Sequence, residues 1–159
     1  MRARPVAATA ALVALPMTAQ AKDAELIDRR TFDATASATA STIHVAGAMA
    51  GELGGYLDVT VTAADGTLPT APGACEPVDV TAALTVSPCE QLDVSTTGEV
   101  CRHQFSPSTL IVNASFGDGD LTYTGTEHKK VKVVGDGLIA ASNSLGFGFG
   151  ASISVPVRW

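Results

Sequence analysis

The fold is decided by residues 78–100, which read VDVTAALTVSPCEQLDVSTTGEV. Apolar side chains occupy the even positions from Val78 to Val86 and again at 92, 94 and 100, with Thr96 in the same set and mostly polar residues between them. A period of two places one set on the buried face of a β-sheet and the other in solvent. The break at residues 87–90 contains Pro88 and suits a tight turn. The stretch therefore predicts a β-hairpin.

The hairpin also constrains the three cysteines. Because the even positions of both strands share a face, opposed residues have even index sums. A loop of residues 87–89 gives the sum 176 and sets Cys75 opposite Cys101, whereas a loop of residues 88–90 gives 178 and sets Cys101 opposite Pro77. Either register brings Cys75 within disulfide reach of Cys101 and leaves Cys89 at the tip. We predict a Cys75–Cys101 disulfide and a free Cys89 thiol, with Cys89–Cys101 as the alternative pairing.

The first 21 residues have the organisation of an export signal. Arg2 and Arg4 precede the apolar run 6–15, and Ala19-Gln20-Ala21 has the small-x-small form of a cleavage site. The run is shorter than the roughly 20 residues that a spanning helix needs. We predict a signal peptide over 1–21, a flexible leader over 22–30 and a single domain over 31–159, secreted and without membrane insertion after cleavage.

Composition narrows the function classes. The chain carries 10 basic and 16 acidic residues, and removal of residues 1–21 leaves 8 basic residues against 16 acidic ones, a net charge of −8. This balance argues against nucleic acid or an anionic membrane as the partner. An oxidising exterior is compatible with a disulfide. The abundance of Ala, Thr, Val and Gly resembles that of exported proteins from high-GC bacteria.

Further alternating segments fill the rest of the domain. They are residues 32–41, 43–49, 56–63, 109–116, 121–126, 131–133, 138–141 and 147–159. The first of them, rich in Ala, Ser and Thr, has a flexible linker as its alternative. No apolar repeat of helical period follows the signal, and polar turns separate the segments. The pattern predicts an all-β antiparallel sandwich with immunoglobulin-like or Greek-key connections.

Two groups of residues deserve comparison with metal sites. The turn Gly117–Asp120, with Asp136, could offer oxygens to calcium, but it lacks the spacing of a calcium loop, and Asp-Gly turns are common in hairpins. Cys101-Arg102-His103 and Glu127-His128 lack the paired spacing of a zinc site. We therefore predict no metal and no cofactor. The basic run 127–132 is typical of a solvated strand end.

The sequence indicates an architecture more clearly than an activity. It contains no G-x-S-x-G, S-x-x-K or Cys-His signature of a nucleophilic enzyme. We therefore predict no catalytic residues and a secreted, non-enzymatic protein that is structural, adhesive or partner-binding, with a Cys89-linked homodimer as one form. The alternative is a small extracellular hydrolase or metal-dependent enzyme whose site gathers His44, His103 or His128 with carboxylates.

Overall fold

The computed structural model describes residues 25–31, 35–50, 55–127, 131–133, 135–144 and 148–158. Within these residues the chain forms strands joined by turns and a single 3₁₀ turn, η1. The elements are β1 (Glu25–Thr31), β2 (Thr35–Ala38), β3 (Thr42–Ala50), β4 (Gly55–Ala63), β5 (Cys75–Ser87), β6 (Glu90–Arg102), β7 (Thr109–Phe116), η1 (Asp118–Asp120), β8 (Leu121–Gly125), β9 (Lys132–Val133), β10 (Gly137–Ser144) and β11 (Gly148–Arg158). The prediction of an all-β protein is confirmed.

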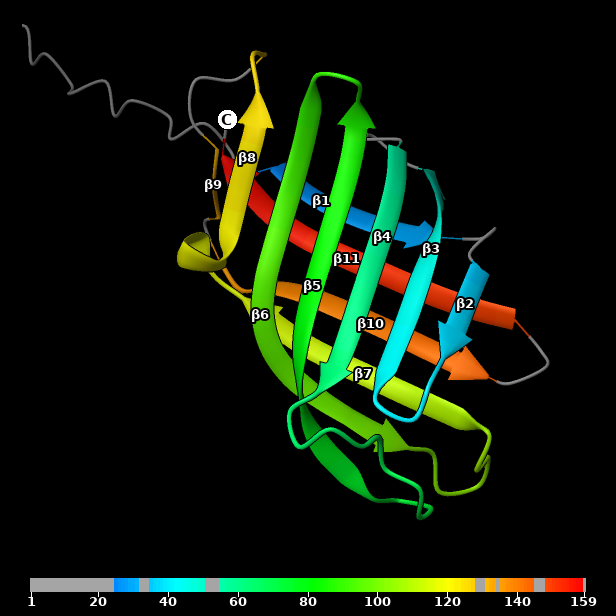
Figure 1. Ribbon diagram of the computed structural model, residues 1–159. Coiled ribbons are helices and arrows are strands. Elements are labelled where there is room, and N and C mark those ends of the chain that lie inside the picture. The colour runs from blue at the N-terminus through cyan, green and yellow to red at the C-terminus, as the bar shows by residue number, and fades with distance from the viewer. Residues whose placement is uncertain are drawn as a thin grey trace, which may run out of the picture.

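All these strands belong to one antiparallel sheet, which is strongly curled. Its order is β1-β11-β10-β7-β6-β5-β4-β3-β2, so most neighbours in the sheet are also neighbours in the sequence, as in a meander. The sheet bends back on itself because β1 also pairs with the end of β3. Figure 1 shows β2 to β6 with β8 in front, and β7, β10, β11 and β1 crossing behind them. Immunoglobulin-like or Greek-key connections are not confirmed by these pairings.

Strand β6 forms the corner between the two layers. Its first half, from Glu90 to Val94, pairs with β8, and its second half, from Gly98 to Arg102, pairs with β7. Gly98 stands opposite Ala114 of β7, and a Cβ atom built on Gly98 would lie 2.5 Å from the carbonyl oxygen of Asn113. The close approach of two backbones at a bend requires glycine here.

The register of the β5–β6 hairpin is the one that the index sum of 176 predicts. Cys75 opposes Cys101, and the pairing continues in step as far as Thr85 and Gln91. The turn itself differs from the predicted three-residue loop, because Ser87 pairs with Glu90 and the register shifts between Thr85 and Ser87. This irregularity absorbs the odd residue, so the even positions of both strands still face inward.

The core fills the space between the two layers. Its fully buried members come from the even positions of β5 and β6 and from the odd positions of β3, β4, β10 and β11, as alternation predicts. The largest of them are Ile43, Leu57, Leu84, Ile139, Ile153, Val45, Val59, Val61, Val78, Val80 and Val100. Val112, Ala114 and Phe116 of β7 are also buried. Burial of these apolar surfaces is the main force holding the curled sheet together.

Three sequence expectations need correction. Most of the stretch predicted as a flexible leader is strand β1, whose main chain pairs with β11 from Glu25 to Arg30. Its residues do not alternate between apolar and polar, so the sequence gives no sign of a strand here. The strand is formed through main-chain pairing. The strand predicted over 32–41 ends at Ala38 of β2, because the main chain turns at residues 39–42, and the start of that prediction, residues 32–34, lies outside the described residues. β10 continues through Ser144, where a turn was predicted.

Candidate functional site

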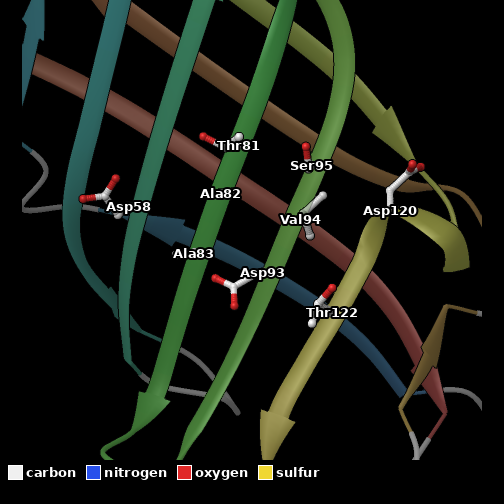
Figure 2. Close-up of a pocket in the computed structure, with 9 residues that line it drawn as sticks. All are labelled: Asp58, Thr81, Ala82, Ala83, Asp93, Val94, Ser95, Asp120 and Thr122. Carbon is white, nitrogen blue, oxygen red and sulfur yellow. The ribbon is translucent and has the colours of Figure 1, made fainter.

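The strands β2 to β6 and β8 form the front layer of Figure 1. An open groove of about 250 Å³ crosses the outer face of this layer (Figure 2). The inward side chains of these strands form the core, so the outward ones are free to meet solvent or a partner. Figure 2 shows carboxylates and hydroxyls from β4, β5, β6 and β8 around the groove. Its lining residues are Asp58, Thr81, Ala82, Ala83, Asp93, Val94, Ser95, Asp120 and Thr122.

Strand register explains why the groove exists. Asp58 on β4 opposes Ala83 on β5, which opposes Asp93 on β6, which in turn opposes Thr122 on β8. These residues form one row across the sheet. The small methyl group of Ala83 stands between two longer carboxylates, about 10 Å apart at the backbone because two strand spacings separate them. The groove therefore has polar side chains at its sides, and its floor at Ala83 is deeper because the alanine side chain is short.

The two carboxylates of this row are already engaged by neighbouring side chains. Asp58 lies with both its oxygens 3.0 Å from the Nε2 atom of His44 on β3. Asp93 accepts a hydrogen bond of 2.6 Å from the Nε2 amide of Gln91 on its own strand. The side chains of His44 and Asp58 are each 44% exposed, so water weakens this interaction and it contributes at most about 1 kcal/mol.

The structure does not bring the described histidines together. His44 lies on the outer face at the edge of the groove, whereas His103 follows the end of β6, where its Nδ1 accepts the backbone N–H of Phe105 at 3.1 Å. His128, the third histidine of the alternative enzyme site, lies outside the described residues. The described residues thus offer one His–carboxylate pair beside a groove.

The carboxylates of the acidic turn before β8 bind backbone N–H groups. Asp120 Oδ2 accepts the backbone N–H of Gly117 at 2.8 Å. Asp118 Oδ1 accepts the backbone N–H of Val133 at 3.0 Å, and its other oxygen lies 3.9 Å from Nζ of Lys132. The carboxylate of Asp118 therefore ties η1, the turn that leads into β8, to β9. Asp118 and Asp120 bond to different segments, unlike converging calcium ligands.

The cysteines lie as the hairpin register arranges them. Cys75 and Cys101 stand at disulfide distance, with sulfur atoms 2.03 Å and Cα atoms 4.0 Å apart. Cys89 is an exposed free thiol beside Pro88 in the turn. Since the sulfur of Cys101 faces Cys75, the segment Cys101-Arg102-His103 does not offer that sulfur to zinc or copper.

Sequence reasoning identified the alternation that points Asp58 and Asp93 outward, but it did not identify the groove. The predicted hairpin register, with its index sum of 176, already sets Ala83 opposite Asp93, so this part of the row could be predicted from the sequence. Asp58 joins the row through the register of β4 with β5, which the long connection over 64–74 leaves open in the sequence.

Comparison with known proteins adds no family to this description. No protein-family model, curated protein or solved structure matches the chain. Among the described residues we find no helix with the length and apolar character to span a membrane.

Proposed function

We propose that this chain is an exported, non-enzymatic protein that acts outside the cell by binding a partner, in adhesion or in association with the cell envelope. The observation that carries the proposal is the polar groove on the outer face of the front layer. It is open, its two row carboxylates are held by His44 and Gln91, and the rigid strands beneath it present a fixed surface. Such a surface suits recognition of another polar surface.

Export rests on the sequence of residues 1–21 and is supported by the cysteine pair at disulfide distance. A disulfide persists in an oxidising compartment and is rare in the cytoplasm. The proposal includes cleavage before Lys22 and a location outside the cell. It also includes the sandwich interpretation of the fold: the two facing layers of Figure 1 support a sandwich, while the meander pairing order counts against Greek-key connections.

The groove gives the binding proposal a direct test. Purified protein is incubated with cell envelopes of the producing organism, and the bound fraction is measured after sedimentation. We expect Asp93→Arg, which reverses a charge in the groove, to reduce binding at least tenfold. Asp79→Arg is the matched control, because Asp79 is exposed on the same outer face of β5 and does not line the groove. Equal binding by both variants and the wild type would show that the groove is not the binding surface.

A small hydrolase is the second candidate, and the His44–Asp58 pair favours it. A histidine held by a carboxylate is the arrangement of a general base, and this one stands beside a groove. Hydrolysis of nitrophenyl esters and glycosides is measured for the wild type, for His44→Ala and for His103→Ala. Activity that disappears in the first variant and persists in the second would replace the binding proposal with an enzymatic one.

A further inference from the structure

A second cavity, of about 260 Å³, lies where the turn between β2 and β3 meets the connection over 64–74 and the end of β6. Its wall is preformed, since the backbone N–H of Leu68 donates to the carbonyl of Ala40 at 2.8 Å. The wall combines apolar side chains, threonines and one arginine. The residues that line it are Ala38, Thr39, Ala40, Thr67, Leu68, Thr70, Arg102 and Leu110.

Arg102 is fixed in this wall by four hydrogen bonds. Its backbone N–H donates to Ala74 and its carbonyl accepts from Gly73, both at 2.9 Å. In the side chain, Nε donates to the carbonyl of Pro69 at 2.6 Å and Nη1 donates to the carbonyl of Pro107. Two of the five N–H groups of the guanidinium are used in this way, and among the described residues Nη2 donates to none, so both N–H groups of Nη2 and the second one of Nη1 are left for a further acceptor.

The charge of Arg102 is not balanced by a carboxylate within the described part of the chain. The salt bridges found there join His44 to Asp58 and Lys132 to Asp118. Among the described residues Arg102 is also the one charged residue that lines the cavity, in a chain whose net charge is −6. A guanidinium without a carboxylate partner is the group that recognises an anion through charge-assisted hydrogen bonds.

The rest of the wall suits an apolar body. Leu68 and Leu110 are 6% and 4% exposed, so both are held in the core, and the small apolar area that each leaves uncovered lines the cavity. The cavity is smaller than the roughly 300–1,000 Å³ of pockets for drug-sized ligands. One guanidinium with a single positive charge matches a monoanion better than a phosphate dianion, which needs more donors and more positive charge.

We propose that this cavity binds a short-chain aliphatic monocarboxylate. Nη2 of Arg102 donates to the carboxylate, and the hydroxyl of Thr70 supplies a further hydrogen bond. Leu68 and Leu110 contact the hydrocarbon chain. The site shares no lining residue with the outer groove, so this proposal does not depend on the proposed function of the groove.

The test is a titration of the purified full chain with butyrate, acetate and inorganic phosphate, followed through backbone amide NMR signals. Butyrate is expected to shift the amides of Thr39, Leu68 and Thr70 saturably and to leave Thr81 on the outer face unshifted. Affinity for butyrate should exceed that for acetate roughly tenfold, because two further methylene groups are buried. Phosphate binding as strong as butyrate binding would overturn the proposal, as would the absence of saturable shifts.

Variants separate the cavity from surface effects. Ala40→Leu fills the cavity from an exposed lining position without removing the backbone bond to Leu68, and it should abolish the butyrate shifts. Ala64→Leu is the control, since Ala64 is exposed and outside the lining. Arg102→Lys keeps the charge but loses the fixed fork, and we expect at least tenfold weaker binding. Shifts that survive in a folded Ala40→Leu protein would show that butyrate binds elsewhere.

Discussion

Replacement of Gly98 by alanine tests whether the close approach of β6 and β7 at the corner requires glycine. The added Cβ atom would lie 2.5 Å from the carbonyl oxygen of Asn113 and 2.7 Å from Cβ of Ala114. Both neighbours belong to β7, so the backbone of one strand must move away from the other. Overpacking of this kind costs about 1–3 kcal/mol. Alanine also makes the unfolded chain less flexible than glycine does, and this effect stabilises the folded state by about 0.4–1 kcal/mol.

The expected net effect of Gly98→Ala is a loss of about 1–2 kcal/mol in the free energy of unfolding. Urea denaturation followed by circular dichroism measures it. With an m value of about 2 kcal/mol/M, the midpoint should fall by about 0.5–1 M. Two other glycines separate the causes. Gly119→Ala adds a methyl group with no atom within 4 Å and should be neutral or slightly stabilising, whereas Gly66, at φ +86°, resists alanine through its backbone alone.

An unchanged or higher midpoint for Gly98→Ala would refute the reasoning. It would mean that β6 and β7 can separate at the corner without cost, and that the tight approach is not needed for the bend. A change in the free energy of unfolding equal to that of Gly119→Ala would refute it too, because the steric contact with β7 would then contribute nothing beyond a general effect of alanine.

Further predictions concern the core, the cysteines and export. Leu84→Ala removes a side chain that is 0% exposed and should lower the free energy of unfolding by about 2–5 kcal/mol, measured by urea denaturation. Cys75→Ser should cost about 3 kcal/mol, since the pair with Cys101 closes a loop of sequence separation 26. Cys89→Ser should leave stability unchanged and abolish any disulfide-linked dimer in size-exclusion chromatography without reductant. Amino-terminal sequencing of the protein from the culture medium should read from Lys22, and an intact start at residue 1 would contradict cleavage.

Alternation was enough to predict the inner faces of the main strands. Leu57, Val59 and Val61 are buried on β4 because a strand with one face in the core must alternate, and sequence records that directly. The opposition of Cys75 and Cys101 was predictable for the same reason, since the two strands of a hairpin share a face and a short turn. Both inferences use local geometry.

The sequence did not predict which residues lie side by side on neighbouring strands, except within the tight β5–β6 hairpin. The contact of His44 with Asp58 depends on the register of β3 with β4, and the sequence between those strands does not fix it. The division of β6 between β8 and β7 depends on the bend near Gly98, which looks like any glycine in a polar stretch. The candidate groove and the Arg102 cavity are products of such long-range arrangements, so they emerged only with the structure.

The place of β1 has a consequence for the order of folding. Glu25 pairs with Val157, while Arg30 pairs with Ala50, so this early segment joins strands from opposite ends of the sheet order. Its main partner, β11, follows all the other described strands in the chain, and pairing across so long a stretch is slow because loop closure comes before any gain in contacts. Until β11 arrives, β10 and β1 both present unpaired edges. We expect a chain truncated before β11 to aggregate through those edges, because they are ready templates for pairing with another copy.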